Sequence, residues 1–162
     1  MNLYLHEFTH LTLSLIIGFI IWKISGNFYA ILVALAGGFF IDLDHLTDYL
    51  LAFRTKFNLV YFLKGYSFLK TDKIYVLFHS WELVFIFFVL TFQRSNIRTF
   101  QPILLSFSFS LFFHLIVDVF INNMKPQSYF LYYRIRNKFE LKALVTSDHY
   151  QKHLRNKKLI KF

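Results

Sequence analysis

Four stretches of this chain are long and apolar enough to form membrane-spanning helices, which take about 20 apolar residues each. They cover Leu3–Ile24, Phe28–Phe53, Ile74–Phe92 and Ile103–Ile121. Because strands average only about 5–6 residues, runs of this length favour helices. The pattern therefore predicts an all-α, polytopic membrane protein in which about four transmembrane helices form a bundle.

Composition agrees with a membrane protein but adds a strongly basic character. The chain is 56% hydrophobic and only 17% charged, yet its net charge is +9. Of the 18 basic residues, five lie between residues 54 and 73, ten follow Ile121, and Arg94 and Arg98 separate the last two apolar stretches. With four crossings, the 54–73 loop and the tail share one side, which the positive-inside rule makes cytoplasmic. We expect a multi-pass protein of the bacterial inner membrane with both termini in the cytoplasm.

The distribution of charge divides the chain into two parts. Residues 1–121 hold eight bases and seven acids, so they form a nearly neutral four-helix transmembrane domain. Residues 122–162 hold ten bases and two acids, interleaved with aromatic rings. This mixture predicts a basic interfacial tail that contacts anionic lipid headgroups. Because topology and lipid account for the bases, nucleic acid is not expected as a partner.

Ionisable side chains within the apolar stretches gather at one depth, near the predicted cytoplasmic face. Ionisable groups in spanning helices are costly and are functional candidates by default. Neutral imidazole and carboxylate are ligands for Zn²⁺, Mn²⁺ or Fe²⁺, and the chain has no Cys for a thiolate site. We therefore expect one or two divalent ions, with zinc preferred. The candidate residues are His10, Asp42, Asp44, His45, His79, Glu82, His114 and Asp118.

Spacing places several of these residues on shared helix faces. His114 and Asp118 are four residues apart, as are His6 and His10. His6 is nevertheless assigned to the membrane interface, because it lies near the start of its helix. The pair Gly37-Gly38 predicts close helix packing or a kink.

Four further residues are interpreted as lying at the surface. Asp48 and Asp72 are interpreted as solvated charges at a membrane boundary. His149 and His153 have metal-like spacing but lie in the basic tail, where a surface position is expected.

Four short motifs follow one another along the chain. They are Thr9-His10, Asp42-Leu43-Asp44-His45, His79-Ser80 and His114-Leu115-Ile116-Val117-Asp118. Their order resembles that of the YdjM-like family of membrane-bound, metal-dependent hydrolases, whose pattern runs Thr-His, Pro-Asp-x-Asp-His, Thr-His-Ser and His-x-x-x-Asp. Here Ile41 and Phe78 replace the Pro and the second Thr of that pattern.

The resemblance implies a set of metal ligands and a catalytic activity. Asp44 would be a further ligand or an orienting carboxylate. The implied ligands are His10, Asp42, His45, His79, His114 and Asp118.

The expected function is a metal-dependent hydrolase near the cytoplasmic face, with Asp44 or Glu82 accepting a proton. A site at headgroup depth favours a lipid-like ester or phosphoester as substrate. One alternative is a haem-binding electron-transfer bundle, although haem has no use for carboxylates beside its ligands. A small metal or proton transporter is the other alternative, although the outer halves of the helices hold mostly Ser, Gly and apolar residues.

Overall fold

The computed structural model describes residues 3–93 and 100–160, and within them the chain is all-helical, with no strand. Arg94 and Arg98 lie outside the described residues. The chain forms two compact units. The first unit comprises Met1–Asp42 and His79–Ile121, and the second comprises Leu43–Phe78 and Asn122–Phe162. The transmembrane domain predicted over residues 1–121 and the tail predicted over 122–162 stay predictions, and in the structure residues 43–78 belong to the same unit as residues 122–162.

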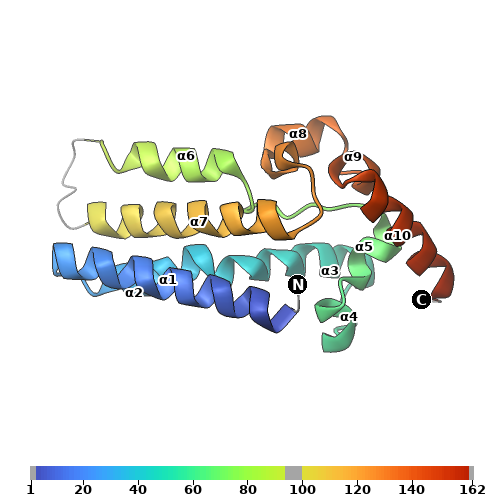
Figure 1. Ribbon diagram of the computed structural model, residues 1–162, viewed down its shortest axis with the longest axis horizontal. Coiled ribbons are helices and arrows are strands. Elements are labelled where there is room, and N and C mark those ends of the chain that lie inside the picture. Colours follow the sequence, from blue (N-terminus) through green and yellow to red (C-terminus); the bar gives the residue numbers. More distant parts are fainter. Residues whose placement is uncertain (1–2, 94–99, 161–162) are drawn as a thin grey trace. The chain divides into compact units, whose positions relative to one another are not determined.

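Four helices pack side by side in the first unit (Figure 1). The central helix is α7, which packs against the other three, and α1 also packs against α2. The amino-terminal end of α1 and the carboxyl end of α7 lie at the same end of this unit. The helices are α1 (Leu3–Ser25), α2 (Tyr29–Gly38), α6 (Trp81–Leu90) and α7 (Gln101–Ile121).

Small residues allow these helices to approach one another closely. A Cβ added to Gly18 would lie 2.7 Å from the Cα of Ile31, and one added to Gly38 would meet the Ser14 hydroxyl. The buried Ser106 hydroxyl donates a hydrogen bond to the carbonyl of Ala30 at 2.5 Å. Small residues and interhelical hydrogen bonds are how helices associate in lipid, where no hydrophobic force drives them together. The close packing predicted for Gly37-Gly38 is therefore present.

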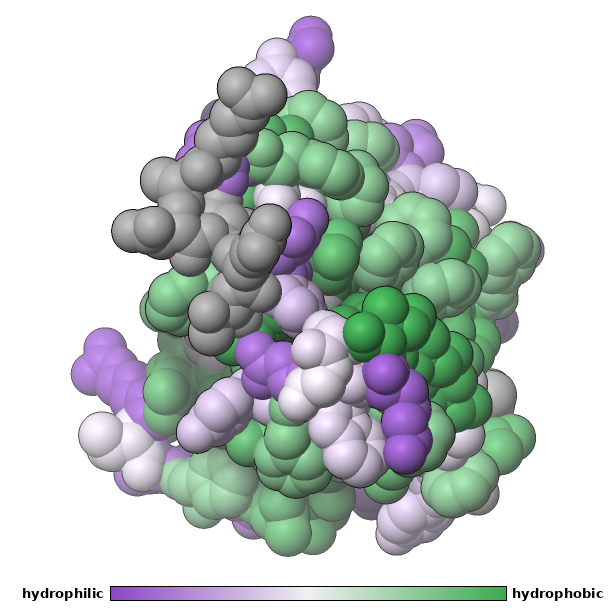
Figure 2. Space-filling model, turned by 90° about the vertical axis from the view of Figure 1, so that its left-hand side faces the viewer, coloured by the Kyte–Doolittle hydropathy of each residue, from purple (hydrophilic) through white to green (hydrophobic). Residues whose placement is uncertain are grey.

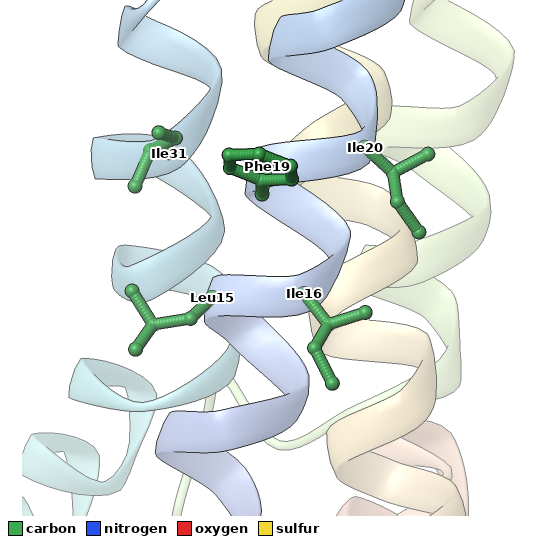
Figure 3. Close-up of a pocket in the computed structure, with 5 residues that line it drawn as sticks. All are labelled: Leu15, Ile16, Phe19, Ile20 and Ile31. Atoms are coloured by element: carbon green, nitrogen blue, oxygen red, sulfur yellow. The ribbon is translucent and has the colours of Figure 1, made fainter.

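The outer surface of the first unit is apolar. In Figure 2 hydrophobic residues cover much of the visible face, with hydrophilic residues scattered among them. A hollow of about 330 Å³ on α1 and α2 is lined entirely by aliphatic and aromatic side chains. Its residues are Leu15, Ile16, Phe19, Ile20 and Ile31 (Figure 3). Ile16 and Phe19 are about half exposed, at 50% and 49%. Such a surface suits contact with lipid tails.

In the part of the chain that the structure describes, two helices are long and apolar enough to cross a membrane, namely α1 from Tyr4 and α7. A third crossing is reached only if the bent pair Tyr29–Gly38 and Phe40–Phe53 is one span. The predicted stretch Ile74–Phe92 is helical only over α6, whose 10 residues rise about 15 Å against a hydrocarbon core of about 30 Å. The four continuous crossings predicted from the sequence are therefore not confirmed.

The third stretch begins without a helix because carboxylates of the second unit bind its backbone. Asp48 accepts hydrogen bonds from the backbone N–H groups of Tyr75 and Val76, at 2.7 and 3.1 Å. Asp44 accepts another from the N–H of Phe78, at 2.6 Å. Asp48 is only 1% exposed, so its assignment as a solvated boundary charge is wrong. Because the N–H groups of Tyr75 and Val76 donate to Asp48, they do not form the backbone hydrogen bonds of a helix.

The second unit folds around a small apolar core that joins the basic tail to residues 43–78. The buried Arg134 guanidinium donates to the carbonyls of Tyr75 and Val76, the same residues whose N–H groups Asp48 binds. The core residues of the second unit are Ile74, Val76, Leu141, Leu144 and Val145. The helical segments are η1 (Phe40–Asp44, shared with the first unit), α3 (His45–Phe53), α4 (Leu59–Leu63), α5 (Tyr66–Thr71), η2 (Pro126–Tyr129), α8 (Leu131–Arg136), α9 (Leu141–Leu144) and α10 (Ser147–Leu159).

One histidine of the tail is part of this packing rather than of the surface. His153 is 5% exposed, and its Nε2 lies 2.8 Å from Asp72 Oδ1. Lys157 pairs with the other oxygen of Asp72. The surface position expected for His153 is therefore wrong, while His149 is half-buried.

Candidate metal centre

Four imidazoles and two carboxylates meet at one end of the first unit. Two come from the first turns of α1, two from the last turns of α7, one from η1, and one from the residue before the Ser80 cap of α6. Ser80 starts that helix by accepting a hydrogen bond from the N–H of Leu83. The six residues are His6, His10, Asp42, His79, His114 and Asp118.

Asp118 lies between the histidines of α1 and the histidine of its own helix. Its Oδ1 is 3.0 Å from His6 Nε2 and 3.3 Å from His10 Nε2. Its Oδ2 is 3.5 Å from His114 Nε2. The two carboxylate oxygens therefore face different imidazoles.

Asp42 serves the other side of His114. Its Oδ1 lies 3.1 Å from His79 Nε2 and 3.6 Å from His114 Nε2. Asp42 lies in η1, four residues beyond the end of α2, and approaches the centre from that side. His114 thus has a carboxylate oxygen on each side.

A backbone hydrogen bond sets the orientation of His114. Its Nδ1 lies 2.9 Å from the carbonyl oxygen of Gly38, which can only accept, so Nδ1 carries the proton. In the neutral ring the Nε2 lone pair is then free to act as a ligand, and this nitrogen is buried with no hydrogen bond of its own. Donation from the second ring nitrogen to a carbonyl is the usual support of a metal-binding histidine.

The centre is removed from water. His10, His79, His114 and Asp118 are each 3% exposed or less. The rings of His10 and His114 stack with centroids 3.9 Å apart. A buried carboxylate needs a compensating positive charge, and a metal ion supplies one. Groups of three side chains within this set have ligand atoms within 4.8 Å of one another, so the residues present fit a metal ion.

Five of the six ligands implied by the family resemblance lie in the first unit. These are His10, Asp42, His79, His114 and Asp118. The sixth, His45, is described within the second unit, where it begins α3 and its ring lies 5.7 Å from that of Phe68.

The two expected proton acceptors occupy different places. Asp44 is 5% exposed and binds the backbone of Phe78, the residue before His79. This contact gives Asp44 a positioning role for the segment that leads to His79. Glu82 lies in the first turn of α6 and is partly buried.

His6 is the member of the centre that sequence reasoning assigned to the interface. Its Nε2 is 2.7 Å from His10 Nε2 as well as 3.0 Å from Asp118. The four-residue spacing of His6 and His10 indicates a shared helix face and could have placed His6 in the centre. The position of His6 near the start of its helix led instead to the prediction of an interfacial residue.

Apolar hollows on the first unit do not coincide with the centre. The hollow of Figure 3 and a second one of about 520 Å³ between α1 and α7 are lined without any of the six residues. The convergent ligand atoms therefore mark the site, rather than a hollow.

No family model, curated protein or solved structure matches the chain, so the resemblance to the YdjM-like family stays a prediction.

Proposed function

We propose that this chain is a membrane-embedded, metal-dependent hydrolase whose centre holds a divalent ion, with zinc preferred over manganese or iron. The observation that carries the proposal is the orientation of His114. Its proton is committed to the Gly38 carbonyl, and its lone pair faces oxygens of Asp42 and Asp118. In a neutral His114, a lone pair that faces two carboxylates is repelled by them, and a metal cation between them removes this repulsion. The three groups are therefore arranged for a cation.

A bound divalent ion supplies a Lewis acid and lowers the pKa of its water toward about 7. In hydrolysis, the water oxygen bonds to the acyl carbon or phosphorus, and one water proton passes to the departing alkoxide. We propose Glu82 as the group that accepts this proton first, because it follows His79 by three residues in the same unit. Asp44 is the second candidate for accepting this proton, because it binds the backbone N–H of Phe78, the residue before His79.

The location of the centre supports an amphiphilic substrate. The six ligands lie near the ends of the apolar helices, where a spanning helix meets the headgroup layer. We propose an ester or phosphoester of a lipid-like molecule. We further propose that all four helices of the first unit are embedded in a bacterial inner membrane, that both termini are cytoplasmic, and that the tail contacts anionic headgroups.

The stacking of His10 on His114 favours a metal ion over haem. Ring centroids 3.9 Å apart leave no room for a porphyrin between these two imidazoles. The carboxylates beside them likewise suit a small divalent cation better than a haem.

Elemental analysis of detergent-purified protein tests the proposal. We expect stoichiometric metal in the wild type, a lower metal content in H79A and H114A, and an unchanged content in the control H149A, which changes a histidine of the tail. The metal-loaded wild type is then assayed against carboxylic-ester and phosphoester lipids. Absence of metal from the wild type would overturn the metal centre, and metal without turnover of either lipid class would overturn the hydrolase.

A further inference from the structure

Two of the ligand sets of the centre share Asp118, namely His6 with His10 (the first group) and His79 with His114 (the second group), while His10 also lies within reach of Asp42 and His114. His6 and His10 face Oδ1, whereas His114 faces Oδ2. Asp42 and His79 extend the second group on the far side of His114. A carboxylate with imidazoles on both oxygens has the arrangement of a bridge between two ions.

The first group has the dimensions of one coordination sphere. The distances among His6 Nε2, His10 Nε2 and Asp118 Oδ1 are 2.7, 3.0 and 3.3 Å. Ligands about 2.1 Å from one ion lie about 3.0 Å apart in octahedral and about 3.4 Å apart in tetrahedral geometry. Three ligands on one face of an ion therefore fit these atoms.

The second group fits a separate ion equally well. Asp42 Oδ1 is 3.1 Å from His79 Nε2 and 3.6 Å from His114 Nε2, and His114 Nε2 is 3.5 Å from Asp118 Oδ2. His79, His114 and Asp118 also have ligand atoms that all lie within 4.8 Å of one another. Two imidazoles and a carboxylate oxygen are a common set of protein ligands for a divalent cation.

A single ion cannot bind both His6 and the histidines His79 and His114. Opposite ligands of a single ion are at most about 4.2 Å apart, twice a bond of about 2.1 Å. Among the described residues, no ligand set with all atoms within 4.8 Å pairs His6 with Asp42, His79 or His114. His6 therefore belongs to a different coordination sphere from these three.

We infer that the centre holds two divalent ions bridged by the Asp118 carboxylate. His6 and His10 bind one ion, and His79 and His114 bind the other, with Asp42 beside these two histidines. The inference rests on the proposed metal centre and adds a second ion with His6 as its ligand. Two-metal sites place their ions about 3.5–4 Å apart, a separation that one bridging carboxylate spans.

Metal stoichiometry tests the inference. Detergent-purified protein is loaded with Mn²⁺, freed of excess metal, and analysed for manganese and by electron paramagnetic resonance. We expect two ions per chain with an exchange-coupled spectrum in the wild type and in the control H149Q. In H6Q and in H79Q we expect about one ion with the spectrum of isolated Mn²⁺, and D118A should lose most of both ions.

The outcomes separate this inference from the metal centre itself. One ion in the wild type, unchanged in H6Q, would overturn the second ion and leave the single-metal centre standing. No ion in the wild type would overturn both. Should H6Q fail to elute as a folded species, H6C with zinc takes its place, because thiolate is also a zinc ligand. Two zinc ions in H6C support the inference, whereas one ion in H6C and in the wild type contradicts it.

Discussion

His114 donates the hydrogen on its Nδ1 to the carbonyl oxygen of Gly38 at 2.9 Å. This contact joins the carboxyl end of α2 to the last turns of α7, and it decides which ring nitrogen faces the carboxylates. Gly38 can offer its carbonyl because it has no side chain. A Cβ there would meet the Ser14 hydroxyl and lie 3.0 Å from Ser110 Cβ. Close packing and ligand orientation therefore depend on the same residue.

We expect G38A to lower metal affinity about 10- to 100-fold, the usual effect of losing the partner that orients a metal ligand. The added methyl group must push α2 away from α1 and α7, so the carbonyl that holds His114 moves. Competition with a fluorescent chelator measures the affinity. The control A36L lies on the exposed side of the same helix and should leave affinity unchanged. Equal affinities in G38A and the wild type would separate the Gly38 contact from metal binding.

The surface of α1 provides a test of membrane insertion. Ile16 is half exposed in the apolar hollow of Figure 3. An arginine at the centre of a spanning helix costs about 2.5–3.5 kcal/mol on insertion scales. We therefore expect I16R to reduce the fraction of chain that resists alkaline extraction from membranes, while I16L behaves as the wild type. Full retention of I16R would argue against a lipid-facing position for this residue.

The buried carboxylate of Asp48 should stabilise the second unit. D48A leaves the backbone N–H groups of Tyr75 and Val76 without their acceptor. Hydrogen bonds to charged groups contribute about 1.5–3 kcal/mol each, so we expect a loss of at least that size in the free energy of unfolding. Denaturant unfolding followed by circular dichroism measures it. D148A, at an exposed position in α10, should change stability by less than about 1 kcal/mol. Equal stabilities of D48A and D148A would contradict the assigned role of Asp48.

Asp72 should make the docking of α10 sensitive to acid. Burial raises the pKa of this carboxyl, but hydrogen bonds from Lys157 and His153 outweigh it and hold the pKa below its usual value. A depressed folded-state pKa contributes stability above the unfolded pKa of about 3.9, and this stability is lost as pH falls through the lower folded value.

Amide hydrogen exchange in α10, compared at equal pH, tests this prediction. We expect the wild type to be better protected than D72N at pH 6, and the difference to vanish in acid below the folded pKa of Asp72. Lys158 is exposed on the same helix, so K158Q serves as the control for loss of charge alone. A difference between wild type and D72N that persists unchanged into strong acid would contradict the linkage.

Several features of the centre were predictable because they depend on local geometry. The four-residue spacing of His114 and Asp118, and of His6 and His10, places each pair on one helix face. The depth of His10, His79 and His114 along their apolar stretches placed them at a common level. Hydropathy likewise identified α1 and α7, whose helical hydrogen bonds lie within each segment.

Contacts between distant segments decided the rest. Asp44 and Asp48 bind the first N–H groups of the stretch Ile74–Phe92, but nothing in the stretch itself shows this. Its hydropathy therefore predicts a longer helix than the 10 residues of α6. His6 enters the centre because Asp118, 112 residues away, lies opposite it. The sequence by itself determined which residues share a helix face, since a helix repeats every 3.6 residues. Only the tertiary structure decided which faces meet and where helices end, because those depend on partners far apart along the chain.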